Sequence, residues 1–558
     1  MEFLGFLTKR GRAGVEFFAV AFKLAESFGA FARNRVEPTR RKNPKDRQKN
    51  IAVGICVFRA LDPGSLGMKF PWMGMSLALL SACASTVGES AKGRSAIECE
   101  VGIVGGGPAG VYMAYRLSPR YGAKLCLFEK EAKLGGRMND EPFETRDGGS
   151  VWVGTGARRV NEAQPEVLAL ARELGLELQT PPRRAQLIHA RGRYASNPEA
   201  FLADFPGLPG PLDGDPATNR EDEIYALLLR EKARAGGKTL RAYVGEVAGP
   251  RAVDYLSAVS RFHADFDYEI SAANYLDVLE HEFRTGAVNL YPVGGMSAFI
   301  RAMEARMLAA GVRVFRAQPV ESFSAHGEGY RLLTPSFQAQ VARAVFAVPP
   351  VGFDRIGGEL AERIRAAESY RALLPIPVVV INQAWAEPWW DAAPRATGVR
   401  GEEARYWRAW SRDQCVNHTE IPQEPYARAA GVVRSVYTDD PACVRYWREL
   451  RERGGLEAVE REVVAGLEKL WRPRRGGRAW RIGKPLRTTM HEWGAGWYYV
   501  RAGARVSNAE IARWSMEPIP GRRNLMLVGE SYWATRPGWS EGAYFSVDAL
   551  LRARFAKD

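Results

Sequence analysis

The stretch between residues 97 and 129 constrains the fold more than any other part of the sequence. An apolar run at 97–104 leads into a turn with glycines at positions 105, 107 and 110, and an amphipathic stretch follows. A second apolar run then ends in an acidic residue, Glu129. This order of strand, glycine turn, helix, strand and acid predicts a Rossmann-type unit that binds a dinucleotide.

Each glycine of the turn has its own physical task. Gly105 permits the tight bend, Gly107 lets the backbone approach a pyrophosphate, and Gly110 lets the helix expected at 109–118 pack on the first strand. The start of that helix directs partial positive charge at the phosphates. Glu129 is placed to accept a hydrogen bond from a ribose hydroxyl, and its charge disfavours NADP, whose extra phosphate it would repel.

Directly after this acid, residues 133–137 read Lys-Leu-Gly-Gly-Arg. With this turn the sequence resembles the flavin-containing amine oxidoreductase superfamily, which includes monoamine and polyamine oxidases, L-amino acid oxidases and carotenoid desaturases. The resemblance implies that FAD is the cofactor. It also implies that the turn containing Gly136 and Arg137 lies by the cofactor diphosphate.

Further segments resemble this family in the order in which it uses them. Residues 291–296 precede a helix expected at 297–310 and strand residues that include Val320, similar to the family's second FAD-contacting segment. Residues 345–350, Val-Phe-Ala-Val-Pro-Pro, resemble the strand that ends this insert.

The last part of the chain completes the resemblance. Residues 524–530 form an apolar run that ends in Gly529 and Glu530, as in the family. Residues 538–543 resemble the start of the family's last helix, and they include Ala543. Such a helix end would point amides at the pyrimidine edge of the flavin.

The implied fold class is α/β, with a Rossmann-like FAD-binding domain and an interleaved α+β substrate domain of the amine oxidase type. The FAD-binding domain is expected at 97–159, 291–350 and 481–558, and the substrate domain at 160–290 and 351–480. A Pro/Gly-rich loop at 205–216 is typical of a surface excursion or an active-site lid.

One basic pair bears on the substrate. Residues 156–159, Gly-Ala-Arg-Arg, resemble a turn of L-amino acid oxidases whose arginine pairs with the substrate carboxylate. Arg159 matches that arginine, and a planar guanidinium suits bidentate binding of a carboxylate. The alternative is that Arg158 and Arg159 form a surface pair in an arginine-rich protein.

Aromatic residues near the C-terminus bear on the amine. Residues 491–499 resemble a late segment of the family that brings an aromatic ring to the flavin face. Tyr498 and Trp539 would then be two walls of an aromatic cage, unless their rings belong only to the core. Trp497 stands where monoamine oxidases place a flavin-linking cysteine, so FAD is expected to be held without a covalent bond.

The sequence departs from the family at one position. Many members carry a lysine in the strand after the Val-Pro-Pro element, where it holds a water against flavin N5. The corresponding run at 374–382 has none, and no lysine occurs between Lys238 and Lys469. Oxygen as the electron acceptor is therefore in doubt, while an FAD-dependent oxidoreductase remains the expectation.

The expected reaction oxidises the C–N bond of an amine or L-amino acid, with hydride passing to flavin N5 and oxygen or another acceptor reoxidising the flavin. Two alternatives stay open. A desaturase or dehydrogenase acting on C–C bonds would keep the fold. A catalytically decayed, lipid-anchored flavoprotein would account for the missing lysine.

Histidine and cysteine give no metal signal. The histidines are scattered, and although His263 and His281 fall in the expected substrate domain, neither is expected to be catalytic. The six cysteines form no CxxC pair and no repeated spacing, so neither a zinc site nor a dense disulfide framework is expected. No metal is expected.

The net charge of +14 does not indicate a nucleic-acid partner. Residues 1–67 hold 13 Lys/Arg against 6 Asp/Glu, about half of the excess, and the rest shows no basic block interleaved with aromatics. The charge distribution favours an enzyme over a nucleic-acid binder.

The N-terminal segment 1–96 is expected to be a poorly ordered extension. Residues 68–83 have a short basic start and an apolar run ending in Leu-Ser-Ala-Cys, which resembles a bacterial signal peptide with a lipobox. If Met68 starts translation, Cys83 would be a lipid anchor to the membrane, and the address periplasmic or outer-membrane. Otherwise the run is a chance apolar stretch, and the expected location is cytoplasmic.

Overall fold

The computed structural model describes residues 96–144, 149–180, 185–208, 220–282, 288–393, 395–396, 400–421, 431–471, 481–533 and 535–556. All described residues belong to one compact unit, 84–558. The proposed signal peptide with Cys83 and the part of the proposed lid at 209–216 lie outside the described residues.

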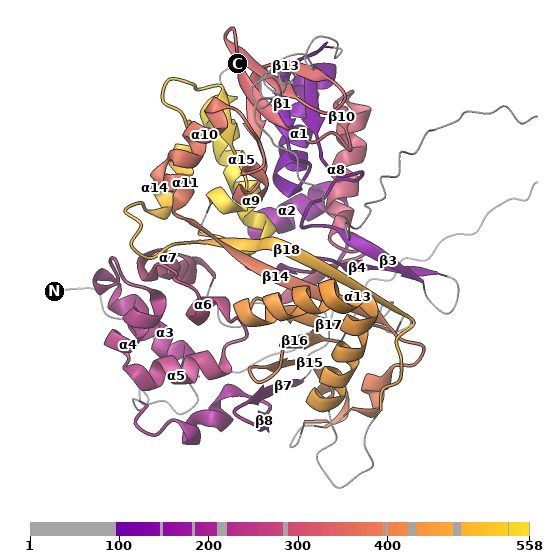
Figure 1. Ribbon diagram of the computed structural model, residues 1–558, viewed down its shortest axis with the longest axis vertical. Coiled ribbons are helices and arrows are strands. Elements are labelled where there is room, and N and C mark those ends of the chain that lie inside the picture. Colours follow the sequence, from indigo (N-terminus) through magenta and orange to yellow (C-terminus); the bar gives the residue numbers. More distant parts are fainter. Residues whose placement is uncertain are drawn as a thin grey trace, which may run out of the picture. The chain divides into compact units, whose positions relative to one another are not determined.

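The first sheet contains the expected dinucleotide-binding unit (Figure 1). Strands β1 and β2 are joined by α1 and pair in parallel, and β13, β10 and β19 extend the parallel part. Strands β11 and β12 add antiparallel pairs at one edge. The bounds are β1 Ala96–Val104, α1 Pro108–Tyr121, β2 Leu125–Phe128, β10 Arg313–Phe315, β11 Ser322–His326, β12 Gly329–Leu333, β13 Gln338–Phe346 and β19 Leu525–Leu527.

Both faces of this sheet are covered, as the apolar runs of β1 and β2 require. One face packs against helices α1, α2 (Pro165–Leu174), α8 (Ser297–Ala309) and α15 (Ser540–Arg554). The other face packs against α9 (Pro350–Phe353), α10 (Glu359–Ala366), α11 (Glu368–Arg371) and α14 (Asn508–Ser515). The expected α/β class and Rossmann-like unit are confirmed.

The second sheet has the strand order β18-β14-β17-β16-β15-β7-β8. Its two longest strands, β14 and β18, pair in antiparallel and cross the middle of Figure 1. The bounds are β7 Ala185–Ala190, β8 Arg193–Ala195, β14 Leu373–Ala384, β15 Tyr406–Ser411, β16 His418–Glu420, β17 Val432–Thr438 and β18 Arg487–Val500.

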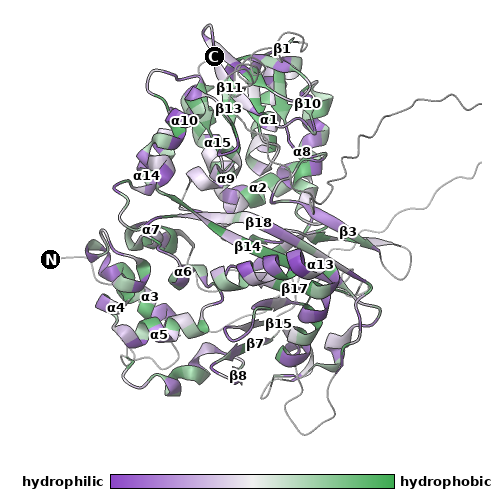
Figure 2. Cartoon of the chain, viewed as in Figure 1, coloured by the Kyte–Doolittle hydropathy of each residue, from purple (hydrophilic) through white to green (hydrophobic). Residues whose placement is uncertain are grey.

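Alternation along β14 gives the second sheet two apolar faces. Val378 and Val380 face a group of short helices, α3 (Arg220–Arg230), α4 (Leu240–Val247), α5 (Pro250–Val259), α6 (Ala264–Asp267) and α7 (Ala272–Glu282). Val379 and Ile381 face α13 (Pro441–Leu470), which is kinked at Gly455. In Figure 2, α13 carries hydrophobic and hydrophilic residues in alternation, as expected for a helix with one buried side.

Smaller sheets connect these layers. Strands β3 (Asp140–Glu144) and β4 (Ser150–Gly154) pair in antiparallel, and β5 (Val160–Asn161) and β6 (Leu178–Gln179) each pair with β9 (Asn289–Pro292). The chain therefore leaves the first sheet after β2, builds part of the second sheet and its helices, and returns through α8. The exact bounds of the two expected domains remain a prediction.

Two disulfides lie within the described residues, although the cysteine spacing gave no sign of them. Cys99 and Cys126 link the adjacent strands β1 and β2, and Cys415 and Cys443 link the loop before β16 to the start of α13. Each bond joins segments that are brought together by pairing or packing rather than by sequence.

In the part of the chain that the structure describes, no helix has the length and apolar character needed to cross a membrane.

Candidate active site

The glycine turn has the geometry that its sequence requires. Gly105 has a φ of 102°, a conformation that favours glycine, and a Cβ on Gly110 would overlap the Gly105 carbonyl oxygen. Apart from Gly107 and its two chain neighbours, no atom of the described residues lies within 4 Å of the position that a Cβ on Gly107 would take. Helix α1 starts directly after Gly107, and no side chain caps it. The turn thus offers a close backbone approach and a helix start for an anionic group.

Glu129 lies at the end of β2 and fixes this turn. Its Oε2 accepts a hydrogen bond of 2.6 Å from the amide of Gly106, and its Oε1 accepts one of 2.9 Å from the amide of Glu131. Burial raises the pKa of the Glu129 carboxyl, while these two amides lower it. The backbone amide of Gln318 donates to the Glu129 carbonyl, which holds this segment beside the end of β2. Val320, two residues later, is buried.

The second glycine turn lies against the first. The amide of Gly135 donates to the Gly106 carbonyl at 2.8 Å, and a Cβ on Gly136 would lie 3.2 Å from the Gly107 Cα. Gly136 has a φ of 50°, in the left-handed region. The two glycine turns are therefore in contact where the resemblance places the cofactor diphosphate.

Arg137 joins this region to the C-terminal segment. Its Nη2 lies 3.0 Å from Glu530 Oε2, and its Nη1 donates to the Gly496 carbonyl at 2.6 Å. Glu530 Oε1 in turn accepts hydrogen bonds from the amides of Tyr498 and Gly538. One ion pair therefore connects the glycine turns, β18 and the segment that leads into α15.

The arrangement fits FAD. The space beside Gly107 is open within the described residues, an acid follows β2, and Gly529, with a φ of 142°, turns the chain before Glu530. Ala543 is buried on α15, whose first turn begins directly after Trp539. Gly105, Gly107, Glu129 and the turn at Gly136 would hold the dinucleotide, and the start of α15 would lie by the flavin.

The two aromatic residues expected to form a cage lie in different surroundings. Tyr498 is fully buried in the core beside the first sheet, and its hydroxyl accepts a hydrogen bond from the amide of Val351. Trp539 is half-buried, and within the described residues its ring makes no close contact with that of Tyr498. The cage itself stays a prediction.

Trp497 lies beside the segment that carries Trp539. Its side chain would lie 3.8 Å from a Cβ on Gly538, the residue before Trp539. Its ring centroid lies 5.9 Å from that of Phe262 and 6.4 Å from that of Tyr499, in edge-to-face arrangements. Side chains alternate along β18, so Trp497 and Tyr498 lie on opposite faces of this strand. The sequence pattern alone did not show which of the two faces the helices α3 to α7.

Arg158 and Arg159 are not a surface pair. Their side chains are only 11% and 19% exposed, and they bind the two oxygens of one buried carboxylate, Glu420, at 3.1 and 2.9 Å. The turn that carries them is held to the dinucleotide-binding unit, since the amide of Ala157 donates to the Arg137 carbonyl. The pair thus bridges the glycine turns and the second sheet.

Glu420 lies in a row of polar side chains that crosses the second sheet. It pairs in register with Arg408 on β15 and with Arg434 on β17, so the three side chains share one face. Arg434 Nη2 donates to the carbonyls of Gly154 and Gly156, at 3.0 and 3.1 Å. This contact fixes the turn before Arg158 from the side of the sheet.

More positive than negative side chains surround Glu420. Burial alone would raise the pKa of its carboxyl, but Arg159, Arg158 and Arg434 lower it well below its ordinary value. Burial lowers the pKa of Arg434 to about 10 and that of His418 to about 3, so His418 is neutral at pH 7. One carboxylate therefore faces several guanidinium groups in a buried place.

The sequence did not signal Glu420, Arg408 or Arg434 as site residues. They lie in different strands, within a stretch that has no motif. Only the pairing of β15, β16 and β17 aligns them. A row of charged residues at buried strand positions is the one signal that could have found them, and it requires the sheet register.

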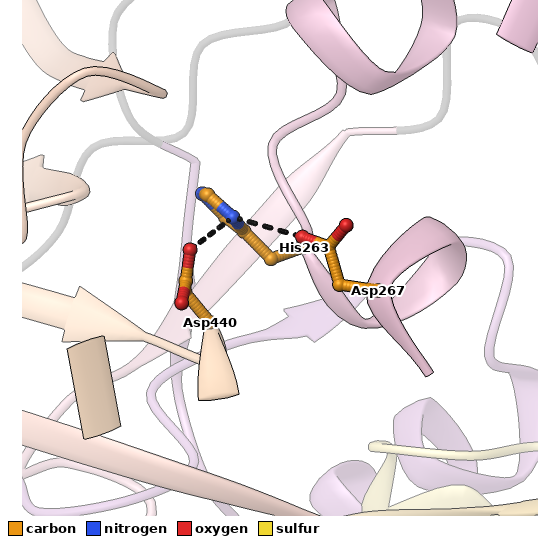
Figure 3. Close-up of side chains that lie close together, drawn as sticks. All are labelled: His263, Asp267 and Asp440. Carbon is orange, nitrogen blue, oxygen red and sulfur yellow. Dashed lines mark ion pairs between the residues drawn. The ribbon is translucent and has the colours of Figure 1, made fainter. Parts of the chain in front are cut away.

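His263 belongs to a separate cluster (Figure 3). Its Nδ1 lies 2.8 Å from Asp440 Oδ2 and 3.3 Å from Asp267 Oδ2. Burial lowers the pKa of His263, but the two carboxylates raise it above its ordinary value. Since Arg412 and Arg241 also pair with Asp267, we interpret the cluster as ion pairs that join α6 to the start of α13.

Glu541 is a second buried acid that the sequence did not single out. It lies fully buried in the first turn of α15. Burial raises the pKa of its carboxyl to about 7, with Arg536 opposing and Glu166 adding to this shift. The folded protein therefore favours the protonated form of Glu541.

Two glycine substitutions should separate folding from cofactor binding. Gly110→Ala should destabilise the protein itself, because the new Cβ overlaps the Gly105 carbonyl. Gly107→Ala should leave the melting temperature of the cofactor-free protein unchanged yet abolish copurification of FAD. Absorbance at the flavin band and thermal unfolding measure both effects. Gly245→Ala, at an uncrowded position of α4, is the control, and FAD retained by Gly107→Ala would contradict the assignment.

Glu541→Gln should stabilise the protein at alkaline pH. The folded-state pKa of about 7 exceeds the ordinary 4.5, so this carboxyl's contribution to stability is full below pH 4.5 and is lost as the pH rises to 7. The variant should therefore gain up to about 3 kcal/mol at pH 8 and less at pH 5. Thermal unfolding at both pH values tests this, with exposed Glu362→Gln as the control. An equal gain at both pH values would rule it out.

Comparisons with known proteins agree with this site. The sequence profile described as flavin containing amine oxidoreductase matches residues 108–546, well over half of the chain. A search of curated proteins gave no match.

Solved structures show the same fold. A putrescine oxidase double mutant with redesigned cofactor binding is 16% identical with a TM-score of 0.59, over 83% of this chain and 100% of that chain. Wild-type putrescine oxidase bound to putrescine is 15% identical with a TM-score of 0.55, over the same shares. Cyclohexylamine oxidase from Brevibacterium oxydans is 16% identical with a TM-score of 0.58, over 82% and 99%. The family match, together with the glycine turns, Glu129 and the Arg137–Glu530 pair, shows that this chain belongs to the flavin-containing amine oxidoreductases and is an FAD-dependent enzyme.

Proposed function

We propose that this enzyme oxidises the C–N bond of an amine that carries a carboxylate, as an L-amino acid does. The observation that carries the proposal is the surplus of buried guanidinium groups around Glu420. Arg159 uses one Nη for Glu420, and its buried Nε has no hydrogen-bond partner among the described residues. A carboxylate on the substrate would satisfy this donor and reduce the excess of positive charge.

The residues of this chain have three tasks in such a reaction. Arg159 orients the substrate through its carboxylate, and the contact of Ala157 with the Arg137 carbonyl fixes that arginine relative to the cofactor turn. Trp497, Trp539 and Phe262 offer apolar surface, which favours the neutral amine over the ammonium and limits access of water. FAD, when bound, supplies the hydride acceptor at N5. The product imine hydrolyses after release, and oxygen or another acceptor takes up the electrons.

Two alternative functions are compatible with the same cofactor site. A desaturase or dehydrogenase acting on C–C bonds would use the same cofactor site. An apolar substrate, however, offers no anionic group to pair with a buried arginine cluster. A decayed, lipid-anchored flavoprotein remains the hypothesis that the missing lysine favours, since β14 (Leu373–Ala384) has none. The names of the similar structures refer to simple amines, and the arginine cluster is the feature that points to an amino acid instead.

Anaerobic mixing of the FAD-loaded chain with panels of L-amino acids and simple amines tests the reaction directly. We expect L-amino acids to bleach the oxidised flavin band. Arg159→Ala should raise the concentration for half-maximal bleaching by about 10- to 100-fold for carboxylate-bearing amines only, the value of a charge-assisted hydrogen bond. Arg159→Lys should restore part of it, and Arg172→Ala, exposed on α2, should change nothing. If no amine bleaches the flavin, amine oxidation is wrong.

We also propose that the chain is exported and anchored by Cys83. The Leu-Ser-Ala-Cys sequence supports this, and so do two disulfides in the described residues, because disulfides persist mainly in oxidising compartments. Labelling cells with a radioactive fatty acid should mark the protein in the membrane fraction. Cys83→Ser should remove the label, whereas Cys56→Ser should keep it. A parent protein that stays unlabelled in the soluble fraction would refute the anchor.

A further inference from the structure

Two further arginines lie beside this cluster and share one aromatic ring. Arg408, on β15, has its Cζ 4.4 Å from the centroid of the Trp407 ring and 5.4 Å from that of Trp410. Arg261, two residues after α5, has its Cζ 5.9 Å from the same Trp410 ring. Among the residues that the structure describes, neither guanidinium forms an ion pair, although the charge of the Glu221 carboxyl acts on Arg261 from a greater distance.

Their hydrogen-bonding capacity is only partly used. Arg408 Nε donates to Gln186 Oε1, but its buried Nη1 has no acceptor within the described part of the chain. Burial lowers the pKa of Arg408 well below its ordinary value, and the charges of Arg261 and Arg159 lower it further. Arg261 is exposed, so its guanidinium is accessible to a ligand. A buried cation such as Arg408 is costly unless an anion joins it.

Glu420 is not the anionic partner of Arg408 and Arg261. Its two oxygens already bind Arg158 and Arg159, and Arg434 lies 3.8 Å away. A single substrate carboxylate at Arg159 would still leave Arg408 and Arg261 without an ion pair among the described residues. The cluster therefore has guanidinium groups available for a second anionic group.

The second pair lies on the side of the site where the substrate is expected. Arg261 is followed by Phe262, whose ring packs edge-to-face on Trp497, and Trp497 lies beside Gly538. Arg408 pairs in register with Glu420, whose Oε1 lies 2.9 Å from Arg159 Nη1. The pair thus belongs to the region bounded by Arg159, Trp497 and the segment before α15.

We propose that Arg408 and Arg261, held against Trp410, form a second anion subsite, and that the preferred substrate is an amino acid with an acidic side chain. This inference rests on the proposed oxidation of a carboxylate-bearing amine. The α-carboxylate binds Arg159 and the side-chain carboxylate binds the second pair, which excludes diamines by charge repulsion.

The first test compares L-glutamate and L-aspartate with their neutral isosteres, L-glutamine and L-asparagine, in anaerobic bleaching of the FAD-loaded full chain. The acids should bleach the flavin at concentrations at least about 10-fold lower than the amides. Arg261→Gln should remove this preference by raising the half-maximal concentration for the acids about 10- to 100-fold and leaving that for the amides within about 3-fold. Arg261→Lys should restore part of the preference.

Matched variants keep the test independent of folding. Arg261 has no ion pair to lose, so Arg261→Gln should keep the melting temperature of the parent. Arg408→Met keeps the length of the side chain stacked on Trp407 and should show the same loss of preference. Arg172→Gln on α2 should behave like the parent. Equal bleaching by acids and amides, unchanged in Arg261→Gln, would overturn the subsite and leave amine oxidation intact.

A binding measurement separates this inference from the reaction. Succinate and glutarate should bind the FAD-loaded chain in calorimetric titration at least about 10-fold more tightly than butyrate, and Arg261→Gln should abolish the difference. If no amine bleaches the flavin but this difference is present, the proposed reaction fails and the anion subsite stands. Equal binding of dicarboxylates and butyrate would overturn the subsite whatever the reaction.

Discussion

The ion pair between Arg137 and Glu530 holds together the parts from which the site is built. Arg137 belongs to the turn that touches the first glycine turn, and Glu530 follows the last strand of the first sheet. Through its other oxygen Glu530 binds the amides of Tyr498 and Gly538, while the Arg137 carbonyl binds the amide of Ala157. Because Glu530 is buried, removing its partner would cost several kcal/mol, on the order of 3–5.

The consequences of this pair reach the substrate side. The contact of Ala157 with Arg137 positions Arg158 and Arg159, which extend from the turn to Glu420 in the second sheet. The cofactor region and the substrate region are thus mechanically connected by one short turn. Arg434 strengthens the connection from the sheet, because it donates to Gly154 and Gly156. A small displacement of Arg137 would therefore be transmitted to the residues proposed to bind the substrate.

The electrostatics of the second sheet follow from its register. Arg408, Glu420 and Arg434 come from three strands and meet because β15, β16 and β17 pair in antiparallel. A slip of one residue would turn each of them to the face covered by α13. The stacking of Arg408 on Trp407 and Trp410 uses the weaker hydration of guanidinium, which lets an arginine remain charged in a buried place. The site thus depends on sheet pairing as much as on the identity of the residues.

The sequence by itself determined the dinucleotide-binding unit, the family and the cofactor. The constraints at Gly105, Gly110 and Glu129 are local, acting through steric overlap and a strand end, so a short stretch of sequence is enough to reveal them. Arg159 was found through a motif, yet its partner was not, since Glu420 lies 261 residues away. The disulfides and the polar row were hidden for the same reason: they join segments that only strand pairing or packing brings together. Tertiary structure alone decided which face of β18 carries Trp497 and which carries Tyr498, and where the buried charge of the substrate side gathers. Those outcomes follow from pairing between strands that are far apart in the sequence, and no local sequence pattern indicates such pairing.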